Sequence, residues 1–379
     1  MFLFERLFGV CVYMALLICV CLLLENFKIK SKKLFRYYLV CLCVMAFLYK
    51  PNVTADLYRV YELMDYFSTL TFRQFLNEVA IDRSISLAYM LYWFIGKIGV
   101  YSILPALSAF VSYSVLFYII NKTQETYSIS GRNVSCVLFF VMTTSIYLST
   151  INGIRMMLAL SMLSFCYFRS TVEKKLGFID VLFYCLSIFI HAMSVAIVGI
   201  LIAVVAYDSR KKTSRKVWLA LLAGALLFLV AVFATDLGKD IYEKFLEYIW
   251  GDKHSDTWEY IMGVLIIALL SLAAYDFSRL KNEDDVRQIR TYSAVTVWAI
   301  VIALCMNFEF SIFYRFGAHV AVLFSVPSLM VTLERSKGRK CAFIPSVDLK
   351  TAVMFLSIFI ALISCSRGSL SALKFFELG

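Results

Sequence analysis

The chain alternates between apolar runs and short polar stretches along its whole length. Most apolar runs are about 15 to 20 residues long, which at 1.5 Å rise per helical residue matches the ~30 Å hydrocarbon core of a bilayer. This pattern predicts an all-α polytopic integral membrane protein with about twelve transmembrane helices. We expect these helices at residues 7–25, 34–49, 101–120, 134–150, 154–169, 178–191, 192–206, 217–234, 258–277, 291–308, 312–333 and 350–366.

One apolar segment, 86–99, does not fit this alternation. It is short and contains Lys97. A full crossing here would move every later loop to the other side of the membrane, and the basic residues would no longer collect on one side. We therefore predict a re-entrant or interfacial segment in addition to the spanning helices.

Composition predicts a single transmembrane helical domain over residues 1–379. Hydrophobic residues make up 61% of the chain and charged residues 17%, and the mean hydropathy is +0.80. With 4 prolines and no long polar segment, the sequence leaves no room for a separate soluble domain. The first run, 7–24, lacks a basic start and a small-residue cleavage site, so we expect it to remain as a span.

The net charge of +11 comes from basic residues in short clusters between the apolar runs. Clusters placed in this way report membrane topology rather than nucleic-acid binding. Most of them fall in loops on one side, which predicts that this side is cytoplasmic and that both termini lie outside. Two long polar loops, 50–85 and 235–257, then lie outside, and a solvated surface is the simpler interpretation of the second.

The first outer loop contains the sequence ADLYRVYELMDYF. It places Asp56, Tyr58 and Arg59 among aromatic residues at roughly helical spacing. An interfacial helix with acidic and aromatic faces would suit a sugar. A solvated surface loop is the alternative.

The expected hairpin 134–169 turns at the sequence STINGIR. We expect Asn152 and Gly153 to break the helix, and Arg155 to start the next helix at the outer boundary. A guanidinium beside the free backbone N–H groups of a helix start favours a phosphate. The alternative is an arginine that extends toward lipid head groups.

His191 lies in the sequence FIHAMS, where two short helices meet in the following hairpin. Its expected depth is that of Arg155. Ionisable groups at membrane depth are costly and usually functional. A neutral imidazole there is a candidate base and a protonated one a candidate anion ligand. The alternative is a hydrogen-bonded structural histidine.

A third outer turn has the sequence NFEFSIFYRFGAHV and contains Tyr314 and Arg315. We expect Arg315 to begin a helix at the outer boundary, so that three hairpins bring cationic groups to one depth. A salt bridge to Glu309 is the structural alternative for Arg315, and it is compatible with ligand binding.

Neither a metal site nor another cofactor is expected. The three histidines, His191, His254 and His319, are far apart and have no ligand spacing with cysteines. The 11 cysteines lie in apolar runs or, for Cys341, in a predicted cytoplasmic loop. They are typical of small buried hydrophobic residues, and no outer disulfide framework is expected.

The sequence NGIRMMLALSMLSFCYFRS, followed by FYCLSIFIHAMSVAIVGIL, resembles the Arg-then-His signature of the EpsG family of Wzy-like polysaccharide polymerases. ADLYRVY and FYRFGAH resemble the Asp-Tyr-rich first outer loop and the late Tyr/Phe-Arg-Phe turn of that family. The resemblance implies a GT-C-like bundle and a membrane glycosyltransferase. It would transfer a growing glycan en bloc from undecaprenyl pyrophosphate to the next lipid-linked repeat unit, at the outer face of the bacterial inner (cytoplasmic) membrane.

The implied chemistry assigns roles to the candidate residues. Arg155 and Arg315 would stabilise the leaving pyrophosphate. His191 and Asp56 are the two candidates for removing the proton of the acceptor hydroxyl. Expected partners are the lipid-linked glycan, membrane lipid and a chain-length regulator protein, without nucleic acid. Glycan contacts are expected from Arg59, Tyr58, Asn152 and Tyr314.

Three other classes stay open at this point. An O-antigen-ligase-like glycosyltransferase would use the same donor and differ in its acceptor. A lipid-linked glycan flippase or another transporter would also carry cationic residues, but it should show an internal repeat and charges throughout its depth. A membrane-bound O-acyltransferase would have a membrane-depth histidine, yet outer arginines fit a phosphate better than a thioester.

Overall fold

A computed structural model of the chain describes residues 2–26, 31–53, 55–77, 86–144, 146–175, 177–191, 193–209, 257–280, 286–306, 310–336, 348–366 and 373. The regular elements within these residues are helices. Their bounds are α1 Phe2–Asn26, α2 Ser31–Leu48, α3 Asp56–Thr69, α4 Phe72–Phe75, α5 Ser86–Ile98, α6 Ile103–Tyr127, α7 Gly131–Thr143, α8 Ile146–Asn152, α9 Ile154–Thr171, α10 Phe178–Ile190, α11 Met193–Ser209, α14 Thr257–Ser278, α15 Arg287–Cys305, α16 Phe310–Tyr314, the π-helix η3 Arg315–Val320, α17 Ala321–Arg335 and α18 Leu349–Ser366.

Each expected span that falls on described residues coincides with a helix or with helices in direct succession. The expected span 217–234 and nearly all of the outer loop 235–257 lie outside the described residues. Among the helices described, five are long and apolar enough to cross a membrane, or six if the bent pair α7 and α8 is one span. The chain is therefore a multi-pass membrane protein, whereas the count of twelve spans stays a prediction.

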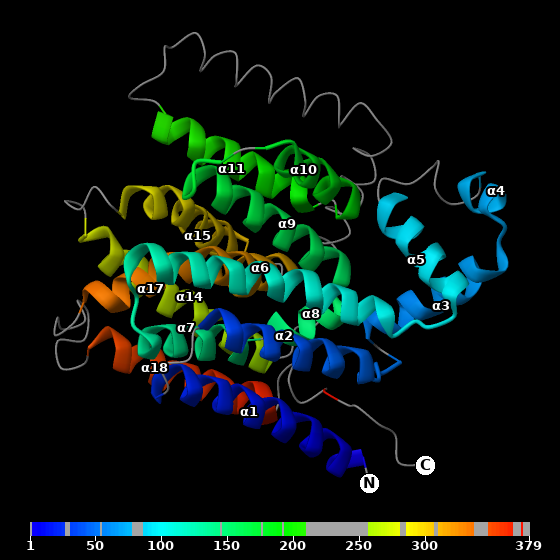
Figure 1. Ribbon diagram of the computed structural model, residues 1–379, viewed down its shortest axis with the longest axis horizontal. Helices are drawn as coiled ribbons and strands as arrows, with labels where there is room; N and C mark the ends of the chain where they lie inside the picture. Colours follow the sequence, from blue (N-terminus) through cyan, green and yellow to red (C-terminus); the bar gives the residue numbers. More distant parts are fainter. Residues whose placement is uncertain are drawn as a thin grey trace.

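The long helices lie side by side along one axis of the molecule (Figure 1). At one end of this bundle, segments that the sequence placed in cytoplasmic loops contact one another. Arg132 pairs with Glu25 at 3.0 Å. The Ser130 amide donates a hydrogen bond of 2.8 Å to the Glu334 carboxylate. These loops share one end, as alternating spans require, and the assignment of that end to the cytoplasm stays a prediction.

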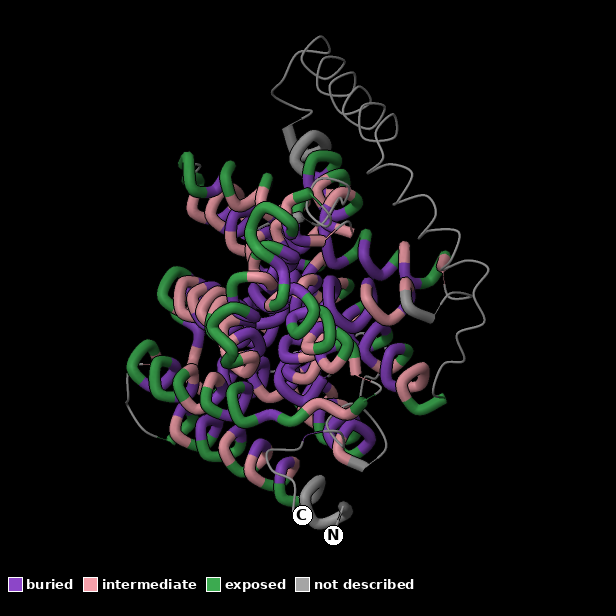
Figure 2. The backbone as a smooth tube through the Cα atoms, turned by 90° about the vertical axis from the view of Figure 1, so that its right-hand side faces the viewer, coloured by how far each residue is buried: buried purple, intermediate pink, exposed green. Residues whose placement is uncertain are grey.

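The centre of the bundle is the span Ile312–Arg335, which ends with α17 and is buried on all sides over its apolar length. A helix that is apolar all round is stable when other helices surround it, and α17 packs against α6, α7, α14 and α15. Figure 2 shows buried residues gathered in the middle and exposed ones on the outward faces. Large apolar side chains such as Leu22, Phe178 and Phe355 are exposed there, as expected for surfaces in contact with lipid.

The predicted span 134–150 is broken inside the molecule. Helix α7 ends at Thr143, and α8 continues after a bend of 51°. The last carbonyl groups of a helix have no partner within it, and water cannot satisfy them in a buried position. Here side-chain hydroxyls satisfy them instead, so the break is stable. The hydroxyls of Thr143, Thr144 and Tyr13 donate to the carbonyl oxygens of Phe140, Val141 and Met142 at 3.0, 2.6 and 2.7 Å.

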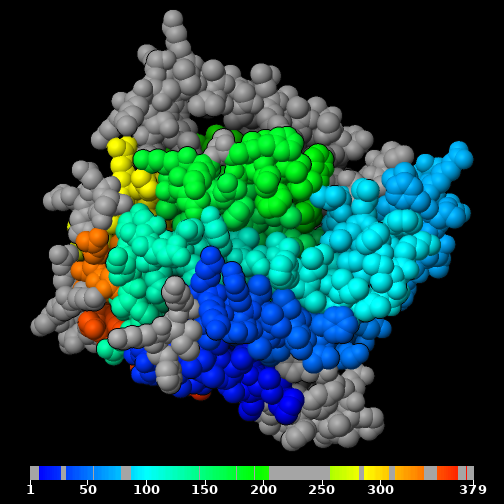
Figure 3. All heavy atoms as spheres, viewed as in Figure 1, coloured from blue at the N-terminus to red at the C-terminus, as the bar shows by residue number. Residues whose placement is uncertain are grey.

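Helices α3, α4 and α5 form a group at the end of the bundle opposite the clustered loops (Figures 1 and 3). Helix α3 is a helix within the segment 50–85, as expected, and its interfacial position on the outer side stays a prediction. It packs closely on α5, because a Cβ added at Gly96 would come within 2.8 Å of the Met64 carbonyl oxygen. The Trp93 indole also donates a hydrogen bond of 3.2 Å to the Leu70 carbonyl. The segment 86–99 is thus a helix docked on α3 rather than a separate long span.

Candidate functional site

The break between α8 and α9 positions Asn152 and Arg155, as the sequence predicted. Gly153 has φ −86° and ψ 45°, which interrupts the helix, and Arg155 is the second residue of α9. The first backbone N–H groups of such a helix have no intrahelical partner. Asn152 donates a hydrogen bond of 3.1 Å to the Tyr49 hydroxyl. Its own amide oxygen is buried and has no hydrogen-bond partner among the described residues.

Asp56 and Arg155 both lie within electrostatic range of a third residue, Tyr92 of α5. Both charges act electrostatically on the Tyr92 hydroxyl, with opposite sign. Asp56 is the first residue of α3 and is 71% exposed, in a loose ion pair of 3.9 Å with Arg59. A pair this exposed contributes little to stability, so the Asp56 carboxylate is accessible to a ligand. Tyr92 therefore lies within electrostatic range of residues at the beginnings of α3 and α9.

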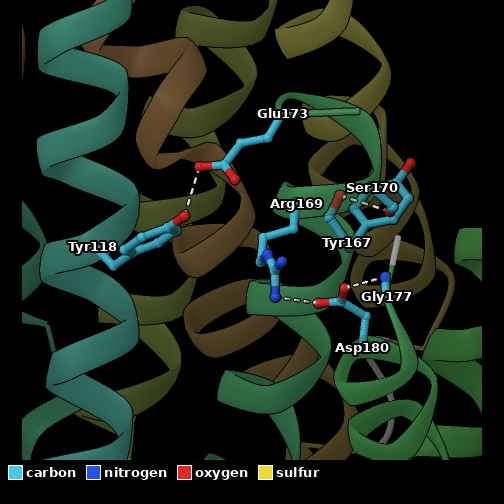
Figure 4. A network of polar contacts seen from close by, with 7 residues as sticks. All are labelled: Tyr118, Tyr167, Arg169, Ser170, Glu173, Gly177 and Asp180. Atoms are coloured by element: carbon cyan, nitrogen blue, oxygen red, sulfur yellow. Dashed lines mark hydrogen bonds and ion pairs between the residues drawn. The ribbon is translucent and has the colours of Figure 1, made fainter. Parts of the chain in front are cut away.

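The position of His191 follows from the register of α9 and α10. Arg169 pairs with the fully buried Asp180 at 3.0 Å, and the rings of Phe165 and Phe183 lie 6.3 Å apart. From the first contact to the second, the residue number decreases in α9 and increases in α10, so the two helices are antiparallel. Figure 4 shows the polar part of this contact, where the Gly177 amide also donates to Asp180 at 2.7 Å.

Counting along both helices from these contacts places His191 opposite Met157. His191 therefore lies within about one helical turn, ~5 Å along the axis, of the level of Arg155. His191 ends α10 in an extended conformation, and its Nδ1 atom accepts a hydrogen bond of 3.2 Å from the Met193 amide. With Nδ1 as acceptor, the neutral ring carries its proton on Nε2 and is a donor there. This geometry favours a role as an anion ligand over a role as a base.

The prediction that Arg315 begins a helix is wrong. Helix α16 precedes it directly, and Arg315 opens the π-helical turn η3 in one continuous helical run. Arg315 therefore lacks the free backbone N–H groups of a helix start, and its side chain is half-buried. Single π-helical turns within α-helices occur frequently at functional sites. Glu309, the expected salt-bridge partner, lies outside the described residues.

His319 in η3 links this segment to α8. Its Nδ1 atom lies 3.3 Å from the Tyr314 carbonyl oxygen, and its Nε2 atom lies 2.6 Å from the Ser149 hydroxyl. A carbonyl only accepts, so Nδ1 is the donor, and in the neutral ring Nε2 accepts from Ser149. His319 is 2% exposed. The bond thus joins the helical segment that carries Arg315 to the one that leads into Arg155.

The structure therefore places Asp56 and Arg155 within electrostatic range of Tyr92 and sets His191 at a level similar to that of Arg155. It connects Tyr314 and Arg315 to the same break through His319. Tyr58 and Arg59 lie beside Asp56 on α3, Tyr58 half-buried and Arg59 exposed. Sequence reasoning missed three residues that contribute to the arrangement, because each is an ordinary polar or aromatic residue in an apolar context. They are Tyr49, Tyr92 and Ser149.

The sequence model of one family, described as EpsG family, matches residues 58–368. This range covers most of the chain and includes every candidate site residue except Asp56. No curated protein and no solved structure matches the chain.

Proposed function

The chain belongs to the EpsG family, a family of Wzy-like polysaccharide polymerases, and on this premise we propose that it joins undecaprenyl-pyrophosphate-linked repeat units into a surface polysaccharide. The product is an O-antigen, capsule or exopolysaccharide. The reaction takes place at the outer face of the bacterial inner membrane, in a GT-C-like bundle without a metal ion. Each cycle transfers the growing glycan en bloc to the next lipid-linked unit.

The observation that supports this proposal is a guanidinium beside a break in the helices, within electrostatic range of the same tyrosine as a carboxylate. Arg155 lies at the N-terminal start of α9, and its charge and that of Asp56 act on the same hydroxyl. Departure of the donor pyrophosphate develops negative charge, which a guanidinium at the start of a helix stabilises. Arg315 provides the second cation, held to α8 through His319 and Ser149.

The Asp56 carboxylate takes the proton of the acceptor hydroxyl. As this proton leaves, the acceptor oxygen forms a bond to the anomeric carbon of the donor glycan, and the bond from that carbon to the phosphate oxygen breaks. Undecaprenyl pyrophosphate leaves with the electron pair. His191 donates from Nε2 to a phosphate oxygen, and Tyr58, Arg59, Asn152 and Tyr314 contact the sugars.

Replacement of the two site arginines tests the proposal in cells. Arg155→Ala and Arg315→Ala should each leave the protein inserted but replace long glycan chains with single repeat units, as resolved by gel electrophoresis of surface glycan. Loss of one fixed donor to a developing negative charge slows such reactions by about 100- to 1,000-fold. Arg279→Ala is the matched control, because Arg279 lies over the Tyr275 ring in a predicted cytoplasmic loop.

The same experiment separates the other classes. Unchanged chain length in both site variants contradicts a polymerase. Loss of all surface glycan, single units included, indicates a ligase or a transporter instead. Long chains should persist in the Arg279 variant.

A further inference from the structure

Tyr92 of α5 has a buried hydroxyl that no described residue satisfies. The residue is 1% exposed, and its hydroxyl has no hydrogen-bond partner within the described parts of the chain. Buried polar groups in folded proteins are paired in the great majority, because an unmade hydrogen bond costs free energy. The Tyr92 hydroxyl can therefore donate to a partner that is not one of the described residues; Tyr38 has a similarly unpartnered hydroxyl, so the charges near Tyr92 must distinguish the two.

The charges beside this hydroxyl identify the chemistry of that partner. The Arg155 guanidinium and the Asp56 carboxylate both act on it electrostatically. An anionic oxygen at Arg155 would be attracted by the guanidinium and would accept a hydrogen bond from the phenol. Such an oxygen satisfies both groups at once, whereas an apolar ligand satisfies neither.

The position of Tyr92 is fixed by its surroundings. The neighbouring Trp93 bonds to the Leu70 carbonyl, and the close approach at Gly96 docks α5 on α3. The rings of Tyr89 and Tyr92 lie 6.1 Å apart. A donor held by packed neighbours loses little conformational freedom when it binds a ligand, which favours binding.

We propose that Tyr92 is a substrate-binding residue whose hydroxyl donates a hydrogen bond to a phosphate oxygen of the lipid-linked donor at Arg155. This inference rests on the proposed function. It gives the short segment 86–99 a role that its sequence did not reveal, because α5 forms one wall of the pyrophosphate site. The ligand chemistry is a pyrophosphate carried by a polyprenyl chain.

Substitution of Tyr92 by Phe separates binding from folding. Because the hydroxyl has no partner in the described chain, Tyr92→Phe should leave the melting temperature of the purified full-length protein unchanged. It should weaken the binding of farnesyl pyrophosphate in detergent by roughly tenfold or more, since the lost hydrogen bond is to a charged group. Tyr38→Phe is a matched control: Tyr38 is also 1% exposed with an unpartnered hydroxyl, but it packs against Phe117.

The proposal would be overturned if Tyr92→Phe bound farnesyl pyrophosphate as tightly as the unmodified chain does. It would also be overturned if Tyr92→Phe had a lower melting temperature and Tyr38→Phe did not. If inorganic pyrophosphate bound as tightly as farnesyl pyrophosphate, the claim that the bound pyrophosphate is carried by a polyprenyl chain would be overturned. If Arg155→Ala weakens binding and Tyr92→Phe does not, the role of Tyr92 alone fails. If Arg155→Ala and Arg315→Ala both leave glycan length unchanged, the proposed function fails. The proposal is supported if Arg155→Ala and Tyr92→Phe both bind farnesyl pyrophosphate weakly while Tyr38→Phe binds it as the unmodified chain does.

Discussion

Removal of the Ser149 hydroxyl should disturb the site without touching either arginine. The hydroxyl lies 2.6 Å from Nε2 of His319, which is 2% exposed. Ser149→Ala leaves this buried nitrogen without its partner, which costs about 1–3 kcal/mol of folding free energy. The bond also holds η3 against α8. A displacement of ~1 Å in a positioned group can cost about 100-fold in rate, so activity should fall more than stability does.

The assay compares purified Ser149→Ala, Ser149→Thr and Ser161→Ala variants by thermal unfolding and by the rate of repeat-unit joining. Ser149→Thr keeps a hydroxyl and should restore much of the rate. Ser161 is a matched control, because its buried hydroxyl donates to the Met157 carbonyl at 2.7 Å within its own helix. If Ser149→Ala retains both the melting temperature and the joining rate, the link through His319 does not position the site.

Three further results are expected. Asp180→Ala should cost about 3–5 kcal/mol of folding free energy, because it leaves the Arg169 charge without its buried partner. Thermal unfolding in detergent measures this loss, and an unchanged melting temperature would contradict the register of α9 and α10. Asp56→Asn should slow glycan joining by about 100- to 10,000-fold at unchanged farnesyl pyrophosphate affinity, as expected for loss of a general base; full activity would exclude Asp56. Asp56→Cys should react with a membrane-impermeant thiol reagent in intact cells, whereas Lys174→Cys should not. Reaction of Lys174→Cys without reaction of Asp56→Cys would invert the topology.

Apolar run length was sufficient to predict where most described helices lie. Each run becomes a helix because backbone hydrogen bonds must be satisfied within the segment at membrane depth. The break between Thr143 and α8 was not predictable in this way. It depends on hydroxyls that lie near one another only in the fold, including that of Tyr13, which is separated from Met142 by 129 positions in the sequence. The π-helical turn at Arg315 likewise leaves no pattern in apolar spacing.

The sequence indicated candidate site residues where a charge interrupts an apolar run and, for Asp56, where charged and aromatic residues alternate in a long polar loop. Arg155 and His191 stand out for that reason, and Asn152 with Gly153 indicated the helix break beside Arg155. Tyr92 and Ser149 carry no such signal, because the sequence is rich in tyrosine and serine within apolar runs. Their importance follows from contacts across α3, α5, α8 and η3, which spacing along one chain does not reveal.

The central claim is that this chain joins lipid-linked repeat units by displacing undecaprenyl pyrophosphate at Arg155. Its most direct test is a reconstitution of the purified chain in liposomes with lipid-linked repeat units extracted from cells that lack it, followed by mass analysis of the lipid products. We expect glycans of two and more repeats on one lipid, with one undecaprenyl pyrophosphate released per joining step, and neither product with Arg155→Ala. Single units that remain unchanged in the presence of active, folded chain would contradict it.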